Sequence, residues 1–255
     1  MIDPKNILIT GASSGIGQEV ALLYAKEGIN LVITGRNKER LLATAKTLEE
    51  KGAGVIVRVL DVTDQKAMAA FIAEVDKKTP LDLVIANAGI GVQSGDFKTL
   101  DEAAKATFEV NVFGVFNTVH PALAVMKERG RGQIALLSSL AGYIGLPSSP
   151  IYSASKNAVR AYGESLRAIH APRGIEVNVI CPGWVRSRIT DRNQYQMPFF
   201  MEAPKAAKII VKGLAKNKGR IAFPWPMVAL IKFMTILPIS WALKILGRVT
   251  MRGRS

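Results

Sequence analysis

The sequence predicts an α/β protein with a doubly wound sheet of seven parallel strands, helices on both faces, and an extra apolar helical tail at the C-terminus. Short β-rich runs alternate with longer stretches whose apolar residues recur at helical spacing. The short runs are apolar at successive positions, as expected for parallel strands that helices cover on both faces. A glycine-rich segment directly follows the first run, which is typical of this architecture.

The predicted elements alternate along most of the chain. Seven runs are predicted strands: Asn6–Thr10, Asn30–Thr34, Gly54–Leu60, Asp82–Ala86, Gln133–Ser138, Glu176–Ile180 and Arg220–Phe223. Six stretches are predicted helices: Ile16–Gly28, Lys38–Lys51, Gln65–Lys77, Leu100–Arg129, Ile151–Ala171 and Pro204–Asn217. In such a sheet the ligand crevice lies at the carboxyl ends of the strands.

Length and composition indicate one compact unit. The chain has 255 residues, of which 49% are hydrophobic and 21% charged, and it shows no low-complexity linker. We therefore predict a single domain over residues 1–225, with residues 226–255 as a tail that is part of it or peripheral to it. Cys181 is the only cysteine, and residues 1–5 run almost directly into a strand without a signal-peptide core, so a cytoplasmic location is expected.

The net charge of +14 is compatible with nucleic acid, an anionic membrane or a polyanionic cofactor. No zinc-ligand cluster or RNA-binding motif is present, so we expect no nucleic-acid partner and no metal site. His120, His170 and Cys181 lack paired ligands in the sequence, and we interpret all three as structural.

The glycine-rich segment Thr10–Gly17 reads TGASSGIG and joins the first predicted strand to the first helix. Backbone N–H groups at such a helix start can bind a pyrophosphate, and the glycines allow a tight turn and close approach of the phosphate. An ordinary glycine-rich turn is the alternative. The position within a repeated strand–helix pattern favours a Rossmann-like nucleotide site.

The second predicted strand ends in Thr34-Gly35-Arg36-Asn37, where NAD-binding sites of this architecture usually carry an acid for the ribose 2′-hydroxyl. Arg36 instead offers a guanidinium, which suits a 2′-phosphate. A solvated surface arginine is the alternative. The missing acid and the position together predict NADP(H).

Tyr152 and Lys156 are four residues apart and therefore share one face of a predicted helix. A neighbouring ammonium favours the phenolate, so the pKa of Tyr152 should fall toward the range useful for proton transfer. The spacing is common by chance in amphipathic helices. Ser139, just after a predicted strand and thirteen residues before Tyr152, strengthens the functional interpretation.

TGASSGIG, Asn87-Ala88-Gly89, Asn111, Ser139, YSASK at Tyr152–Lys156 and Pro182-Gly183 occur in an order that resembles the short-chain dehydrogenase/reductase family over about residues 5 to 225. The resemblance implies that Tyr152 is the acid/base, Ser139 positions the substrate oxygen, Lys156 holds the nicotinamide ribose and Asn111 anchors a proton-relay water. Taken alone, Asn111 would be read as a buried structural amide and Ser139 as a cap.

The same resemblance implies a set of NADP(H) contacts and an oligomer. Ser187 stands where relatives often have Thr, and either hydroxyl can bond the carboxamide. A homodimer or homotetramer is implied, with Leu100–Arg129 and Ile151–Ala171 pairing across a two-fold axis. The implied cofactor residues are Gly11, Ser13, Ser14, Gly15, Ile16, Gly17, Arg36, Asp61, Val62, Asn87, Ala88, Gly89, Tyr152, Lys156, Pro182, Gly183, Val185 and Ser187.

The expected function is hydride transfer between NADP(H) and a carbonyl or alcohol. A substrate loop at about residues 187–203, together with Tyr143, Ile144, Leu146 and Trp184, would border the pocket, and its stretch 195–201 is largely apolar or aromatic. We therefore expect a lipophilic substrate. A nucleotide-sensing binding protein on the same fold is the alternative function, and a sugar-nucleotide epimerase is a third, although epimerases resemble longer chains.

The tail is apolar from Trp225 to about Leu246, but Lys232, Pro238 and Lys244 interrupt it, so it is too short to span a membrane. From Ile239 onward, a basic stripe of Lys244, Arg248 and Arg252 makes the helix amphipathic. The tail is predicted to bind an anionic membrane surface peripherally, with a substrate lid or an oligomer contact as equal alternatives.

Overall fold

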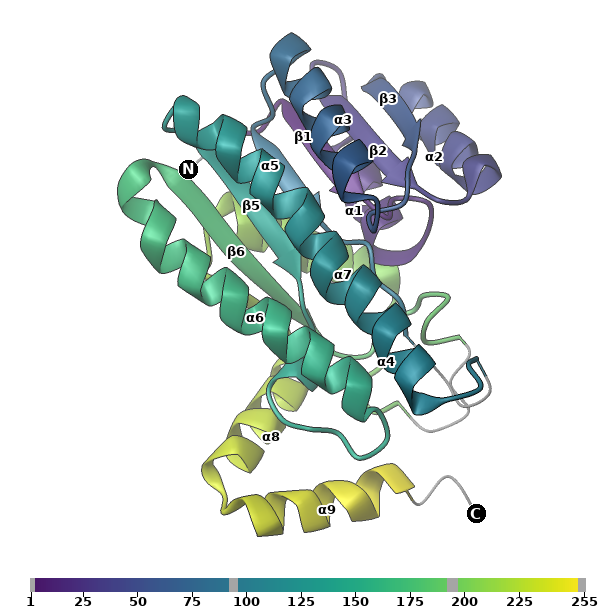
Figure 1. The fold of residues 1–255 in the computed structure, drawn as a ribbon, viewed down its shortest axis with the longest axis vertical. Coiled ribbons are helices and arrows are strands. Elements are labelled where there is room, and N and C mark those ends of the chain that lie inside the picture. The colour runs from purple at the N-terminus through teal and green to yellow at the C-terminus, as the bar shows by residue number, and fades with distance from the viewer. Residues whose placement is uncertain (1–2, 92–95, 192–196, 252–255) are drawn as a thin grey trace.

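The computed structural model describes residues 3–91, 96–191 and 197–251, and within these it describes the side chains up to residue 247. Seven strands form one parallel sheet in the order β3-β2-β1-β4-β5-β6-β7 (Figure 1). This confirms the predicted α/β fold with a doubly wound, Rossmann-like sheet. The strands are β1 (Asn6–Thr10), β2 (Asn30–Gly35), β3 (Gly54–Val59), β4 (Leu83–Ala86), β5 (Gly132–Leu137), β6 (Ile175–Pro182) and β7 (Arg220–Phe223).

Helices cover both faces of the sheet. Apolar residues of α1, α2 and α7 form one core cluster with it, and those of α3, α5 and α6 form a second. The helices of the main body are α1 (Gly15–Tyr24), α2 (Lys38–Glu50), α3 (Gln65–Lys78), α4 (Leu100–Phe108), α5 (Gly114–Glu128), α6 (Pro150–His170) and α7 (Ala203–Ala215). Short 3₁₀ turns, η2 (Leu140–Gly142) and η3 (Ala171–Arg173), follow β5 and α6.

The central strand β1 shows why this sequence forms a two-sided sheet. Ile7 and Ile9 pack into the first core cluster, whereas Leu8 packs into the second. All three side chains are buried. Because successive side chains of a strand point to opposite faces, a continuous apolar run packs against the helices on both faces of the sheet.

Side-chain caps set several of the helix starts. Asn37 accepts a hydrogen bond from the Arg40 backbone N–H at the start of α2, and Asp64 accepts one from Ala67 at the start of α3. Pro150 occupies the first turn of α6, where its missing N–H needs no partner. These residues fix where α2, α3 and α6 begin after the loops at the carboxyl ends of the strands.

The predicted helix Leu100–Arg129 is divided in the structure. A π-turn, η1 (Glu109–Phe113), separates α4 from α5, and Pro121 lies inside α5 without ending it. The predicted helix Ile16–Gly28 ends early at Tyr24, where Ala25 has an extended backbone. The predicted strand Gln133–Ser138 runs from Gly132 to Leu137, so Ser138 and Ser139 both lie beyond its end.

β3 forms one edge of the sheet, because β2 is its only neighbour in the strand order. Its side chains are partly or fully exposed along its length, including the large apolar Ile56 and Val59. Arg58 bonds Glu74 of α3 and stacks over the Phe71 ring. The edge strand is therefore more open to solvent than the central strands.

The tail consists of two helices, α8 (Trp225–Ile236) and α9 (Ile239–Met251), joined at Leu237 and Pro238. Figure 1 shows them at the end of the sheet toward which β5 and β6 run, beside the first turns of α6. Ile231, Met234 and Ala242 are buried in a third core cluster. No helix in the described part of the chain is long and apolar enough to cross a membrane.

Candidate active site

A large cavity lies at the carboxyl ends of the strands. Its volume is about 1330 Å³, beyond the roughly 300–1,000 Å³ of ordinary small-molecule sites. Its wall includes the glycine-rich loop after β1, the ends of β2 to β6, the first turns of α6, and the tail. The predicted site residues line it with two exceptions: Gly17 and Asn111 lie behind its wall.

The glycine-rich loop depends on close backbone packing. Gly11 and Gly15 have φ of +67° and +60°, a region that side chains disfavour. A Cβ on Gly17 would lie 2.6 Å from the Gly11 carbonyl oxygen and would clash with the Asn87 amide. The Asn87 Nδ2 donates to the carbonyl oxygens of Thr10 and Gly11, at 2.9 and 3.1 Å. Asn87 and Gly17 therefore shape the loop, which leaves a concave backbone cradle facing the cavity.

Two arginines line the cavity beside the end of β2. The Arg36 Nη1 lies 3.5 Å from the Asp61 Oδ2, with both groups accessible to solvent. Arg40, in the first turn of α2, lines the same end of the cavity. Sequence reasoning missed Arg40, although its place in the first turn of the helix that follows Arg36 was a usable signal. This end of the cavity is suited to a phosphate group, which guanidinium groups bind well.

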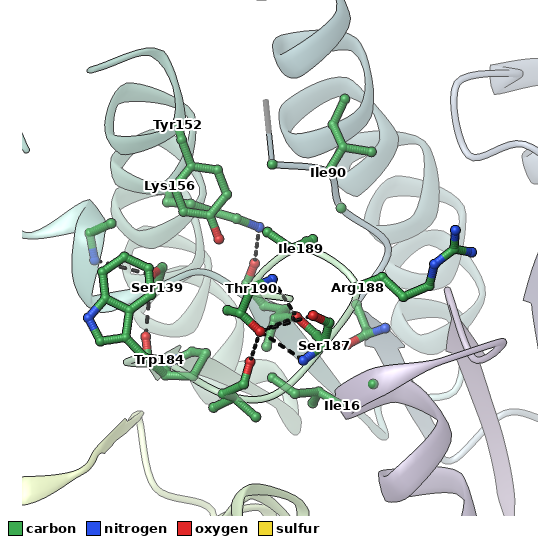
Figure 2. A pocket seen from close by; sticks show the side chains of 18 of the residues that line it. Ile16, Ile90, Ser139, Tyr152, Lys156, Trp184, Ser187, Arg188, Ile189 and Thr190 are labelled. Carbon is green, nitrogen blue, oxygen red and sulfur yellow. Dashed lines mark hydrogen bonds between the residues drawn. The ribbon is translucent and has the colours of Figure 1, made fainter. Parts of the chain in front are cut away.

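Tyr152 and Lys156 project from one face of α6 into the cavity, as their spacing predicts (Figure 2). The Lys156 Nζ is 5.7 Å from the centroid of the Tyr152 ring and donates to the Leu137 carbonyl oxygen at 2.9 Å. Lys156 is only 2% exposed. Burial lowers the pKa of Lys156 to about 8, because a desolvated ammonium is disfavoured.

Ser139 follows β5 and faces the same region of the cavity. Its Oγ accepts from the Ala141 N–H at 3.1 Å and donates to the Pro182 carbonyl oxygen at 3.3 Å. Because the hydrogen bond to Pro182 is long and therefore weak, Ser139 can donate its hydroxyl proton to a ligand instead, at little cost in free energy. Ser139 can therefore act as a hydrogen-bond donor within the cavity.

The segment after β5 is locked against α6. The Ser138 Oγ donates to the Lys156 carbonyl oxygen at 2.7 Å, and the Arg160 Nε donates to the Gly142 carbonyl oxygen at 3.0 Å. A Cβ on Gly142 would come within 2.7 Å of the Lys156 backbone, so only glycine allows this approach. These contacts fix Ser139 relative to Tyr152 and Lys156.

Asn111 occupies the π-turn and is fully buried. Its Oδ1 accepts from the Ile90 N–H at 2.8 Å, while its Nδ2 donates to the Ile90 carbonyl oxygen at 2.9 Å and to the Ser155 Oγ at 3.2 Å. A Cβ on Gly89 would lie 3.1 Å from the Asn111 Oδ1 and 3.3 Å from the Lys156 Nζ. Asn111 thus ties the loop after β4 to α6, immediately behind Lys156.

Ser187 lines the cavity after β6, and Thr190 holds it there (Figure 2). The Thr190 Oγ1 accepts from the Ser187 N–H at 2.8 Å and lies 3.3 Å from the Ser187 Oγ. It also lies 2.8 Å from the Val185 carbonyl oxygen, to which it can donate. Sequence reasoning missed this buried threonine, although a second hydroxyl three residues after Ser187 was a signal for a local turn.

The predicted substrate pocket needs correction at five residues. Leu146, Trp184, Pro198 and Phe199 line the cavity, but Tyr143 and Ile144 do not. The Tyr143 ring instead lies between the Arg160 and Arg220 guanidinium groups, and Ile144 is buried in the third core cluster. Met197, Phe200 and Met201 also lie outside the cavity wall, whereas Tyr195 and Gln196 lie outside the described residues. The tail contributes Met227, Leu230, Ile231, Met234 and Leu246, residues that the sequence analysis did not name individually although a substrate lid was one of its alternatives for the tail.

Comparisons with known proteins agree with this geometry. The family model described as short chain dehydrogenase matches residues 5–197. A "3beta-hydroxysteroid dehydrogenase" of Mediterraneibacter gnavus is 36% identical over 196 residues, which cover 75% of this chain and 70% of that protein.

Two solved structures show the same fold. A short-chain dehydrogenase from Sphingobium yanoikuyae, in complex with NADPH, has a TM-score of 0.79 and 26% identity, covering 86% of this chain and 88% of its own. A short chain dehydrogenase/reductase from Burkholderia phymatum, in complex with NAD, has a TM-score of 0.83 and 25% identity, covering 92% and 95%. The chain therefore belongs to the short-chain dehydrogenase/reductase family, and it is an oxidoreductase of alcohol or ketone groups that uses a nicotinamide cofactor.

Proposed function

We propose that this protein transfers a hydride between NADP(H), in preference to NAD(H), and the carbonyl or alcohol group of a lipophilic substrate, with Tyr152 as the general acid/base. The observation that carries the proposal is that the predicted cofactor, catalytic and substrate residues line one cavity. A glycine-rich cradle lies at one end, Tyr152, Ser139 and Lys156 lie together in its wall, and apolar side chains of the tail line the far end.

The chain fits a dinucleotide at several places. The cradle formed by Gly11 and Gly15 leaves backbone N–H groups at the start of α1 for a pyrophosphate. A Cβ on Gly11 would lie 2.9 Å from the Ala88 Cα and one on Gly15 3.2 Å from the Ser187 Cβ, so the glycines also allow close packing around the cradle. Arg36 and Arg40 provide cations for a 2′-phosphate. Asp61, Val62 and Ser187 line the same cavity; Asp61 and Val62 would flank the adenine, and the Ser187 hydroxyl would bond the carboxamide.

When bound, the nicotinamide ring supplies or accepts the hydride. In the reductive direction the Tyr152 hydroxyl protonates the substrate oxygen, and in oxidation the phenolate removes that proton. Ser139 donates a hydrogen bond to the same oxygen, where negative charge develops. The Lys156 ammonium holds the ribose hydroxyls and favours the phenolate form of Tyr152. Asn111, directly behind Lys156, anchors the water through which the proton is replaced.

The lipophilic part of the proposal rests on the tail and the substrate loop. Leu146, Trp184 and Phe199 line the cavity together with five apolar side chains of α8 and α9. Apolar walls of this extent favour substrates that bury a hydrocarbon portion, since each methylene removed from water contributes about 0.8 kcal/mol. The steroid substrate named for the Mediterraneibacter relative is of this chemical class.

The decisive experiment compares wild type with Tyr152→Phe on ketones of increasing alkyl-chain length. Wild-type kcat/KM with NADPH should rise with chain length. Tyr152→Phe should lower turnover by about 10²–10⁴-fold, the usual contribution of a positioned acid, while NADPH binding by fluorescence titration stays nearly unchanged. Near-normal turnover in Tyr152→Phe would favour a nucleotide-sensing protein. Equal turnover of small polar carbonyls would contradict the lipophilic substrate class.

A further inference from the structure

Exposed apolar side chains gather on the tail. Eight of the seventeen large apolar side chains that are exposed among the described residues lie between Trp225 and Ile245. Ile236 is 82% exposed, Trp225 79% and Trp241 65%. Single exposed apolar residues are ordinary, but such a concentration on two adjacent helices marks an interaction surface.

The charge of this region indicates the occupant of that surface. Residues 225–255, which form the tail, contain five of the 34 lysines and arginines of the chain and none of its 20 acids. Lys232 on α8 and Lys244 on α9 are both exposed. These basic residues would attract an anionic surface, and no acidic group of the tail would repel it. A two-fold contact between two copies would instead place this acid-free region against itself, with positive charge facing positive charge.

The lengths of the helices determine the mode of contact. α8 has 12 residues and α9 has 13, about 18 and 20 Å of helix at 1.5 Å per residue. Both are shorter than the hydrocarbon core of a bilayer, about 30 Å. Trp225 and Trp241 are of the residue type that concentrates at the boundary between headgroups and acyl chains. The two helices are therefore suited to lie in the plane of the interface.

α8 also forms part of the cavity wall. Met227, Ile231 and Met234 line the cavity, whereas Phe233 and Ile236, on the same helix, are exposed to solvent. Leu230 does both, since it lines the cavity and is 50% exposed. Phe199, on the substrate loop, is likewise exposed and part of the lining. The cavity thus opens beside the exposed apolar surface of the tail.

We propose that α8 and α9 dock on an anionic lipid bilayer and that lipophilic substrates enter the cavity from the acyl layer, past Leu230 and Phe199. The proposal rests on the proposed function for the substrate that is delivered, but docking itself does not. It assigns the tail two connected roles, as a wall of the substrate cavity and as its contact with the membrane.

Docking is tested by sedimentation with vesicles of phosphatidylcholine alone or mixed with phosphatidylserine, at low and high salt. Wild type should bind the anionic vesicles, release them at high salt and barely bind neutral ones. Lys232→Glu/Lys244→Glu should weaken anionic binding by at least tenfold, since each basic residue near such a surface contributes about fivefold. Ile236→Ser should also weaken binding.

Matched variants control for charge and apolar area. Lys216→Glu changes an exposed lysine just after α7, and Leu100→Ser changes an exposed leucine on α4. Both should bind vesicles like wild type. Docking is overturned if wild type stays in the supernatant with anionic vesicles at low salt. It is also overturned if Ile236→Ser dissociates an oligomer by light scattering without changing vesicle binding, which would assign the surface to a second copy.

Substrate entry is tested with a long-chain ketone held in anionic vesicles and a short ketone free in water. Lys232→Glu/Lys244→Glu should lower turnover of the vesicle-borne ketone at least tenfold, with the short ketone and NADPH binding unchanged. Equal turnover of the vesicle-borne ketone by this variant and wild type would overturn the entry route. Failure of wild type to reduce either ketone would instead overturn the proposed function, and sedimentation would still decide docking.

Discussion

Lys156 combines deep burial with a charge that the proposed chemistry needs. Its Nζ donates to the Leu137 carbonyl oxygen, and burial lowers the pKa of Lys156 to about 8. At neutral pH the residue therefore remains mostly an ammonium, but it loses its proton more than two pH units below an ordinary lysine. This brings its titration into the range where enzymes are assayed.

NADPH affinity should accordingly be constant below pH 7.5 and weaken as pH rises through about 8, because the ammonium that holds the ribose is lost. Fluorescence titration of the cofactor between pH 6 and 9.5 measures this. Lys156→Met should bind more weakly at pH 7 and show no transition near pH 8. A wild-type affinity that stays flat to pH 9.5 would show that the charge of Lys156 does not contribute to binding.

Arg36 is the residue on which the proposed cofactor preference depends. Charge-assisted bonds to a 2′-phosphate contribute about 1–3 kcal/mol, which corresponds to roughly 5- to 150-fold in kcat/KM. Wild type should prefer NADPH by such a factor, and Arg36→Asp should reverse the order. Arg131→Asp, at an exposed arginine outside the cavity lining, is the control. Equal or better use of NADH by wild type would rule out the assignment.

The position of a side chain could be predicted from sequence where a fixed local spacing sets it. It could not be predicted where tertiary packing determines which way the side chain points. Tyr152 and Lys156 are brought to one face by the helix itself. Tyr143 was wrongly placed in the pocket, because its ring turns toward Arg160 and Arg220, two residues far from it in sequence.

The π-turn η1, which separates α4 from α5, determines the position of Asn111. A π-turn inserts an extra residue into a helix and is frequent at functional sites. Here it presents Asn111 to both backbone groups of Ile90 and to Ser155. Gly114 directly follows the π-turn, but a single glycine within a helical pattern does not by itself end a helix, which explains why one continuous helix was predicted over Leu100–Arg129.

Asn111→Leu should destabilise the protein by about 2–4 kcal/mol, because it leaves the Ile90 N–H and carbonyl without their side-chain partners. Thermal or denaturant unfolding measures the loss, and kcat should fall as the loop after β4 moves relative to Lys156. The exposed Asn157, which accepts one bond from Arg160, provides the control. Asn157→Ala should change stability by less than about 0.5 kcal/mol. Similar losses in both variants would contradict this account of the π-turn.

Most elements were predictable because the period of the apolar residues changes clearly between strands and helices. β1 and β7 were predicted with the bounds that the structure has, and the other strands within two residues. The side of the molecule that the tail covers was not predictable, since residues between Trp225 and Leu246 are apolar around most of both helices. Only the third core cluster reveals that Ile231, Met234 and Ala242 face inward.

The whole molecule presents a further apolar surface on η1, α5 and α6. Phe113 and Ile169 are exposed, and the Phe116 ring stacks on His120 and contacts the Tyr162 ring at a tilt. We expect this surface to pair across a two-fold axis in a homodimer or homotetramer. Light scattering at micromolar concentration should give one of these masses, and Phe113→Lys/Ile169→Lys should lower it. Leu42→Lys, at an exposed leucine of α2, should not. A wild-type monomer would contradict the expectation.

The open edge of β3 should affect the solubility of this protein during expression and storage. Its sequence Gly54–Val59 reads GVIVRV, a short apolar segment rich in β-branched residues with unpaired backbone groups on its outer side. Such an edge can recruit the same strand from another molecule and start aggregation. Arg58 is the single charge within it, and Glu74 and Phe71 hold that charge in place. We therefore expect Arg58 to limit self-association at this edge, and its loss should lower solubility.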